Sequence, residues 1–222
     1  IFMFAGAGTY PVNLNVIDSF GCTHDTTLNV YVSENPLANF AFTSECFGTA
    51  TTFTNQSIDN GGIMSIDTWE WDFDGDGVVD NNTQHPTFVF PLAGTYNTEI
   101  LVTSALGCVD SITIPVNVNP MPVANFGVEN VCLNTEGTFS DSSSVVTGTI
   151  TSWDWDFGDA TGTSVLPSPL YTYTAAGIYN VTLTVVSDSG CTNSKVLPVE
   201  VFQNPTANFD TTDVCLNIAA QF

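Results

Sequence analysis

The segments Trp153-Asp154-Trp155-Asp156-Phe157, Tyr173-Thr174-Ala175-Ala176-Gly177-Ile178-Tyr179 and Asn180-Val181-Thr182-Leu183-Thr184-Val185 decide the fold of this chain. In the first and last segments, aromatic or aliphatic residues alternate with polar ones, which is the pattern of a strand with one buried face. No window of the chain has a convincing helical period. Turn residues recur at the short intervals typical of all-β domains, so we predict an antiparallel β-sandwich of about seven short strands.

The same pattern occurs upstream, where Trp69-Glu70-Trp71-Asp72-Phe73 matches the residues from Trp153 to Phe157. Four other landmarks recur in the same order at intervals of 86 and 83 residues. They are Ala-Asn-Phe at 38–40, 124–126 and 207–209; Cys46, Cys132 and Cys215; Tyr10, Tyr96 and Tyr179; and Gly-Cys at 21–22, 107–108 and 190–191. A period this long is the size of a whole small domain rather than of a solenoid unit.

The phase of the repeat predicts four parts. Residues 1–34 are the C-terminal part of one copy, 35–120 and 121–203 are complete copies, and 204–222 begin a further copy. Prolines precede each Ala-Asn-Phe segment and leave short, stiff linkers, which restrict bending between neighbours. We therefore expect an extended tandem array, of which this sequence is a segment.

The charge of the chain is very unbalanced, with 23 acidic residues against a single basic one and a net charge of −22. Such a surface repels phosphate groups, so we expect no nucleic-acid partner. No apolar run is long enough to span a bilayer, and we expect no direct membrane insertion. A hydrophobic content of 43% still allows folded cores.

Six cysteines without a C-x-x-C pair favour disulfides in an oxidising compartment over a zinc site. We predict that the two cysteines of each complete copy lie at the same end of the sandwich, as Cys46–Cys108 and Cys132–Cys191. Cys22 and Cys215 then pair outside the segment. The alternative is pairing between neighbouring copies, for example Cys22 with Cys46.

Residues 72–80 read Asp-Phe-Asp-Gly-Asp-Gly-Val-Val-Asp, with Asp72, Asp74, Asp76 and Asp80 at positions 1, 3, 5 and 9 of an EF-hand-like loop. Carboxylate oxygens at this spacing, together with the backbone carbonyl of Val78, are typical of a Ca²⁺ site. Position 12 departs from the pattern, because Thr83 stands where a bidentate Glu is expected. The alternative is an Asp- and Gly-rich turn that holds no metal. The downstream copy lacks this loop.

Other side chains could carry chemistry but have simpler explanations. The paired tryptophans at 69, 71, 153 and 155 could stack on sugars, but their spacing favours core positions. His24 and His85 are single, with no evident nucleophile beside them, so a hydrolase triad is disfavoured. We predict no catalytic residues and assign no glycan-binding residues.

The set Trp-x-Trp-Asp-Phe, aromatic-x-x-x-Gly-x-Tyr, alternating strand and Gly-Cys resembles the polycystic kidney disease (PKD) domain family along the whole chain. Residues 156–159 look like the signature turn of that family, with Ala160 where a Gly is usual. The resemblance implies an immunoglobulin-like β-sandwich, an extracellular setting and no catalytic residues. The version with paired cysteines resembles domains of giant Bacteroidota surface proteins, including gliding-motility adhesins exported by type IX secretion.

From these observations we expect a non-catalytic stalk of a long cell-surface adhesin that holds a distal binding tip away from the cell. The alternative is a spacer or carbohydrate-binding segment within a secreted enzyme that degrades polysaccharide or protein. The expected partners are neighbouring copies of the same domain, with surface glycans or other surface and secretion proteins as further candidates.

Overall fold

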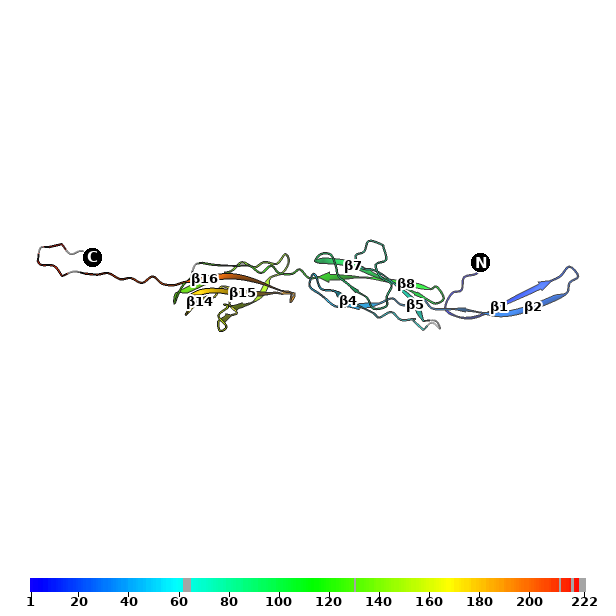
Figure 1. Ribbon diagram of the computed structural model, residues 1–222. Helices are drawn as coiled ribbons and strands as arrows, with labels where there is room; N and C mark the ends of the chain where they lie inside the picture. The colour runs from blue at the N-terminus through cyan, green and yellow to red at the C-terminus, as the bar shows by residue number, and fades with distance from the viewer. Residues whose placement is uncertain (62–64, 130, 212, 217, 220–222) are drawn as a thin grey trace. The chain divides into compact units, whose positions relative to one another are not determined.

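The computed structural model describes residues 1–61, 65–129, 131–211, 213–216 and 218–219, and every regular element in these ranges is a β-strand (Figure 1). The prediction of an all-β fold is therefore confirmed. The chain divides into two compact units, Ile1–Pro120 and Met121–Phe222. Among the described residues, no helix has the length and apolar character needed to cross a membrane.

The strands of the first unit fall into a hairpin and a sandwich. They are β1 (Gly8–Ile17), β2 (Thr23–Val32), β3 (Phe40–Phe42), β4 (Thr51–Asn55), β5 (Ile66–Asp72), β6 (Thr87–Phe88), β7 (Gly94–Ser104) and β8 (Val109–Val118). One layer of the sandwich has the order β3-β4-β6 and the other β5-β7-β8. The two layers enclose a core centred on Phe53, Trp71, Phe73 and Ile100, each with no exposed surface.

The second unit repeats this sandwich with two extra short strands. Its strands are β9 (Phe126–Val128), β10 (Val131–Cys132), β11 (Glu136–Asp141), β12 (Ile150–Asp156), β13 (Thr163–Ser164), β14 (Leu170–Thr172), β15 (Gly177–Ser187) and β16 (Thr192–Phe202). The layers have the orders β14-β11-β9 and β10-β16-β15-β12-β13. Phe139, Trp155, Val181 and Leu183 are fully buried between them.

A corner is built in the same way before β1, β7 and β15. Each of these strands begins at a Gly with positive φ, and the tyrosine two residues later donates a hydrogen bond to a carbonyl four residues before it. The three bonds are Tyr10 to Gly6 at 2.9 Å, Tyr96 to Leu92 at 3.0 Å and Tyr179 to Ala175 at 2.9 Å. A tyrosine whose hydroxyl bonds back to the upstream backbone is a hallmark of immunoglobulin-like sandwiches.

The hairpin β1–β2 has the same register as the hairpins β7–β8 and β15–β16, with ten paired positions in each. Its apolar face has no covering layer among the described residues. Leu14 is 61% exposed and Val16 51% exposed, whereas their equivalents Ile100 and Val102 are fully buried. The hairpin therefore has the strand structure of the C-terminal part of a sandwich without its core.

The segment after β16 has no strand among its described residues. Phe209 is 73% exposed, whereas the equivalent Phe40 and Phe126 are each only 4% exposed in their sandwiches. The Ala-Asn-Phe motif at 207–209 thus repeats the sequence of the other two copies, but its phenylalanine is not packed in a core.

Candidate functional site

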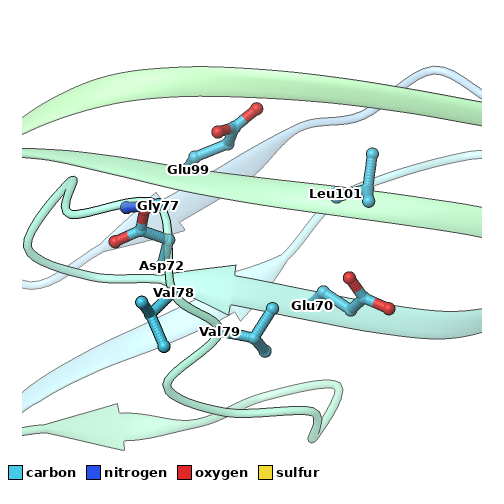
Figure 2. Close-up of a pocket in the computed structure, with 7 residues that line it drawn as sticks. All are labelled: Glu70, Asp72, Gly77, Val78, Val79, Glu99 and Leu101. Carbon is cyan, nitrogen blue, oxygen red and sulfur yellow. The ribbon is translucent and has the colours of Figure 1, made fainter.

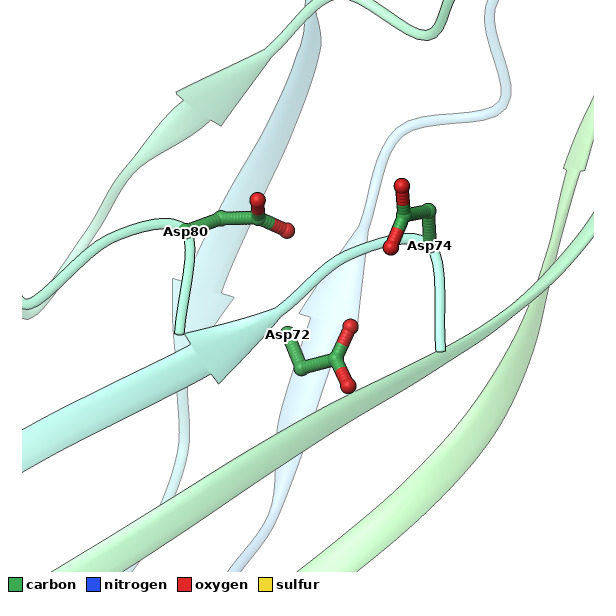
Figure 3. Close-up of side chains that lie close together, drawn as sticks. All are labelled: Asp72, Asp74 and Asp80. Carbon is green, nitrogen blue, oxygen red and sulfur yellow. The ribbon is translucent and has the colours of Figure 1, made fainter. Parts of the chain in front are cut away.

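The Asp-rich loop follows β5 directly, and three of its carboxylates converge. Asp72, Asp74 and Asp80 each place an oxygen within 4.8 Å of the others (Figure 3). Both oxygens of Asp72 accept backbone N–H groups, from Gly75 at 2.7 Å and from Gly77 at 2.8 Å. Gly75 has a φ of +77°, a left-handed conformation that glycine adopts without strain. The loop therefore turns back so that its carboxylates face a common point.

Asp80 connects the end of the loop to β5, the strand from which the loop starts. Its N–H donates to the Trp71 carbonyl at 2.7 Å, and its carboxylate accepts the N–H of Phe73 at 2.8 Å. Asp74 is held much less firmly, since it accepts only the N–H of Asp76 at 3.3 Å. Among the three clustered carboxylates, Asp74 thus contributes least to the loop's own hydrogen bonding.

One of the predicted side-chain ligands is not brought into this cluster, and the position of the missing Glu adds none. Asp76 is outside the group of three, and its carboxylate accepts the N–H of Val78 at 2.8 Å. Thr83, at the position of the missing Glu, instead accepts the indole N–H of Trp71 through its carbonyl at 2.9 Å. The sequence pattern therefore located the loop, but the structure gathers a smaller set of ligands than the pattern predicts.

A shallow groove beside the loop adds negative charge. Glu70, Asp72 and Glu99 line it together with the side chains of Val78 and Val79 (Figure 2). Asp72 and Glu99 are directly opposite each other on the antiparallel strands β5 and β7. Like charges opposite each other destabilise a sheet. Sequence reasoning missed Glu99, because its proximity depends on the register of β5 and β7.

In the downstream copy, the loop after β12 holds its carboxylate with a tyrosine. Asp159 accepts the N–H groups of Thr161 and Gly162 and a short hydrogen bond from the Tyr171 hydroxyl. The hydrogen bond from Tyr171 is the main reason that the pKa of Asp159 lies below its ordinary value. The ring of Tyr171 stacks on Phe157 at a centroid distance of 3.9 Å. This loop therefore satisfies the Asp159 carboxylate with its own hydrogen bonds.

A buried carbonyl at the end of the tryptophan strand finds a different donor in each copy. In the upstream sandwich, Thr98 on β7 donates to the Phe73 carbonyl at 2.8 Å. In the downstream sandwich, Tyr173 donates to the equivalent Phe157 carbonyl at 2.8 Å. Val181 stands in the downstream copy at the repeat position of Thr98. Phe90 stands in the upstream copy at the repeat position of Tyr173.

The tryptophans are core residues in both copies. Trp71 and Trp155 are fully buried, while Trp69 and Trp153 are partly buried and pack against the same cores. The indole of Trp153 donates to Asp141 at 2.7 Å, but the buried indole nitrogen of Trp69 has no acceptor among the described residues. The core interpretation of the tryptophans is confirmed by this packing.

His85 also has a structural role, since its Nδ1 accepts the N–H of Asn55 at 3.2 Å. Its partner is therefore a backbone amide rather than a nucleophile. His24 lies on the exposed hairpin strand β2.

The predicted disulfides within each copy are wrong. Cys46 and Cys191 are each disulfide-bonded, whereas their predicted partners Cys108 and Cys132 are free, as are Cys22 and Cys215 within this chain. Cys46 lies beside Asn119, just after β8, whereas Cys108 lies just before β8. A strand rises about 3.3 Å per residue, so the ten-residue β8 separates the two cysteines by more than 30 Å. A disulfide requires Cα atoms roughly 4–7 Å apart.

The second copy has the same geometry. Cys132 pairs with Phe202 at the end of β16, and Cys191 precedes the start of that strand. The two cysteines of each sandwich therefore mark its opposite ends. The prediction that both cysteines of a copy lie at one end of the sandwich is wrong because the last strand, β8 or β16, separates them by its full length.

Comparisons with known proteins agree with this architecture. A family model described as "PKD domain" matches residues 117–201. The pre-pro-metalloprotease PrtV of Vibrio cholerae is 40% identical over 85 residues, which are 37% of this chain and only 9% of that protein. The solved PKD1 domain of Vibrio anguillarum Epp is 35% identical, with a TM-score of 0.37, and the match covers 39% of this chain and 99% of that one.

The PKD1 domain of Vibrio cholerae PrtV is 37% identical, and the match covers 36% of this chain and 96% of that domain with a TM-score of 0.34. The residues matched by the family model begin near the end of β8 and end within β16, so they contain the downstream sandwich with its tyrosine corner and buried Trp155. Residues 117–201 of this chain form a PKD domain.

Proposed function

We propose that this protein is a non-catalytic, extracellular spacer built from tandem PKD domains. The observation that carries the proposal is the repetition of one corner and one hairpin at β1–β2, β7–β8 and β15–β16, with the same register each time. A chain that repeats the same sandwich gains length with each copy. By this proposal, residues 1–34, 35–120, 121–203 and 204–222 belong to four successive copies.

The interiors of both sandwiches support a structural role. Large aromatic side chains fill each core, and the buried hydroxyls of Thr98 and Tyr173 each donate to a backbone carbonyl. The net charge of −22 adds repulsion between domains and keeps such an array soluble. The disulfide state of Cys46 and Cys191 and the similarity to a segment of a pre-pro-metalloprotease both support an extracellular location.

Two settings fit such a spacer. We propose first the stalk of a cell-surface adhesin, of the kind found in Bacteroidota gliding motility, in which copies accumulate to hold a binding tip away from the cell. The second setting is a spacer in a secreted degradative enzyme, which the 40% identity to PrtV favours. In either setting the direct partners are neighbouring copies, with surface glycans or other exported proteins as partners of the parent molecule.

An antibody against residues 35–203 distinguishes these settings in the producing organism. A stalk predicts signal on intact cells that external protease removes, and a high-molecular-weight band in the cell fraction. An enzyme spacer predicts the signal in the culture supernatant, in a band with hydrolytic activity. Signal confined to the cytoplasm would refute both.

We also propose that the loop at residues 72–80 binds Ca²⁺ through Asp72, Asp74 and Asp80. Three converging carboxylates, with Glu99 opposite Asp72, form a concentration of negative charge that a divalent cation would neutralise. The bound ion would hold the loop closed and stabilise the upstream domain by mass action. Asp76 and Val78 remain candidate ligands only if the loop rearranges around the ion.

Asp74 is the best position for a test, because it adds little to the loop in the absence of metal. Calcium should raise the melting temperature of the wild-type upstream domain, and Asp74→Asn should remove that increase without changing stability in chelator. Asp76→Asn is the matched control and should retain the calcium response. Asp72→Ala is unsuitable, because it also removes two backbone hydrogen bonds. An equal calcium response in wild type and Asp74→Asn would exclude the site.

A further inference from the structure

We propose that Tyr171 and Asp159 form a redox-active pair that takes up one-electron oxidation of the downstream domain. An oxidant removes an electron from the Tyr171 phenol, and the phenolic proton passes to the Asp159 carboxylate along the hydrogen bond that joins them. Both residues lie within the second compact unit. The proposal therefore depends neither on calcium in the upstream domain nor on the setting of the parent protein.

The contact between the two side chains is fixed from both sides. Asp159 follows the end of β12 by three residues, and its other carboxylate oxygen accepts the N–H groups of Thr161 at 3.1 Å and Gly162 at 2.7 Å. Tyr171 is the central residue of the short strand β14, which pairs with β11. A Cβ atom at Gly162 would overlap the Tyr171 hydroxyl, so the glycine leaves the room in which the contact forms.

Tyr171 belongs to a stack of three tyrosines whose hydroxyls have different acceptors. Its ring contacts that of Tyr173 at a centroid distance of 4.9 Å, and Tyr173 contacts Tyr179 at 4.3 Å. The hydroxyls of Tyr173 and Tyr179 donate to the backbone carbonyls of Phe157 and Ala175. An amide carbonyl is too weak a base to take a proton, whereas a carboxylate takes one readily. Oxidation of this stack is therefore easiest at Tyr171.

The resting protonation states of the pair suit this transfer. Burial, together with the hydrogen bond to Asp159, raises the pKa of Tyr171, so the phenol is neutral and protonated at ordinary pH. The hydrogen bond from Tyr171 lowers the pKa of Asp159, so the acceptor is an ionised carboxylate. A phenol that has lost an electron is a much stronger acid than a neutral phenol. The carboxylate is then in position to take its proton.

A buried indole lies close enough to pass an oxidising equivalent to the pair. Trp155 is fully buried, and its ring stacks on Phe157 at 6.3 Å, which in turn stacks on Tyr171 at 3.9 Å. Electron tunnelling is fast across two such ring contacts. An indole radical has a higher reduction potential than a tyrosyl radical at neutral pH. An oxidised Trp155 therefore draws an electron from Tyr171 and is restored.

Trp153 is a second ring of this domain with a carboxylate partner, since its indole N–H donates to Asp141 at 2.7 Å. Its ring makes no aromatic contact among the described residues and is not part of the stack that leads to Tyr171. Oxidation of Trp153 produces an indole radical, which is a stronger oxidant than a tyrosyl radical. Trp153 is therefore a poorer end point for the oxidising equivalent than Tyr171.

The upstream copy has the same ring stack without this phenol. Phe73, Phe88 and Phe90 follow one another there at centroid distances of 4.4 and 5.0 Å, and Tyr96 continues the stack at 4.4 Å. Phe88 stands at the repeat position of Tyr171. The sandwich thus accepts phenylalanine at this position, and the Tyr171 hydroxyl is not needed to build the stack.

The reaction is balanced by an external oxidant and an external reductant. A one-electron oxidant, such as a hydroxyl radical, an azide radical or a peroxidase intermediate, accepts the electron, and Asp159 holds the proton as a neutral carboxylic acid. A thiol or ascorbate then returns an electron to the tyrosyl radical, and Asp159 gives the proton back. No bond between heavy atoms forms or breaks. The pair would thus spare the buried Trp155 from irreversible oxidation.

Pulse radiolysis of the full chain with azide radicals, which oxidise indole rings preferentially, tests the pair. In wild type we expect indole-radical absorption to decay in a fast phase that is independent of protein concentration, while tyrosyl-radical absorption grows at the same rate. Tyr171→Phe should abolish this phase, because it keeps the ring and removes the phenol. Asp159→Asn should slow it severalfold, because an amide still accepts a hydrogen bond but takes no proton.

Two further variants act as controls, and circular dichroism verifies that each variant is folded. Tyr31→Phe removes an exposed phenol outside the stack and should leave the fast phase unchanged. Tyr173→Phe should also retain the phase, since the Tyr173 hydroxyl has a carbonyl as its acceptor. An unchanged fast phase in Tyr171→Phe would overturn the proposal. Equal rates in Asp159→Asn and wild type, or loss of the phase in Tyr173→Phe, would overturn it as well.

Discussion

Tyr173→Phe should destabilise the downstream domain because it leaves a buried carbonyl without a donor. The Tyr173 hydroxyl donates to the Phe157 carbonyl, and the tyrosine is only 1% exposed. Desolvation of this hydroxyl is the main reason that the pKa of Tyr173 is raised, so the neutral donor form persists at all ordinary pH values. Water has little access to replace the lost hydrogen bond.

The size of the effect follows from the burial of the carbonyl. Leaving a buried acceptor unsatisfied costs about 1–3 kcal/mol. For a domain of this size each kcal/mol lowers the melting temperature by roughly 4–8 °C. The upstream domain indicates a compensating substitution, because there Thr98 donates to the equivalent carbonyl of Phe73. Adding Val181→Thr to Tyr173→Phe should therefore restore at least ~1 kcal/mol relative to the sum of the single changes.

The full chain contains its own control, because the other domain is unchanged in each variant. Urea titrations followed by pulsed hydrogen exchange and mass spectrometry report the two domains separately. The reciprocal pair extends the test, since Thr98→Val should weaken the upstream domain and added Phe90→Tyr should restore it. Val181→Thr alone should not stabilise, since Tyr173 already donates to the Phe157 carbonyl.

Strict additivity in both domains would refute this reasoning. It would mean that the two hydroxyls do not serve the same carbonyl and that the exchange of donors between copies has no energetic basis. A Tyr173→Phe variant as stable as wild type would refute it more directly.

Two further predictions concern a missing hydrogen-bond acceptor and a carboxyl group whose pKa is lowered. Asn55 stands at the repeat position of Asp141, 86 residues upstream. Asn55→Asp should therefore stabilise the upstream domain by about 1 kcal/mol, because it offers the buried Trp69 indole the carboxylate acceptor that Asp141 gives Trp153. An unchanged urea midpoint would contradict this. Because the pKa of Asp159 is lowered from 3.8, the stability it contributes is complete above that pH and is lost as pH falls through the lowered pKa. The urea midpoint should therefore fall less steeply on acidification in Asp159→Asn than in wild type. Equal slopes in the two proteins would show that the hydrogen bond from Tyr171 to Asp159 does not cause the pH dependence of stability.

Much of the fold follows from the sequence because each strand carries its own signal. Period-two alternation identifies the long strands β7 and β15, and the Gly-x-Tyr turn locates their starts. The short strands β6, β10 and β13 have two residues each, too few for any periodicity. Their existence depends on pairing with distant strands, and this information is not local in the sequence.

The Asp-rich loop at residues 72–80 shows the limit for functional residues. The spacing of aspartates located the loop, since the chain must turn at its glycines. Which carboxylates converge depends on the backbone hydrogen bonds that orient them, and these turn Asp76 toward the Val78 N–H instead. Glu99 approaches the loop through cross-strand register, which spacing along one strand cannot indicate.

The cysteines show that a residue pattern can be correct while its pairing is misread. Both cysteines recur with the period of the domain, so periodicity alone fits bridges within copies and bridges between copies equally well. The decisive quantity is the length of the last strand, because a Gly-Cys turn before ten extended residues cannot reach a cysteine beside their far end. That quantity is visible in the alternation from Ile112 to Val118.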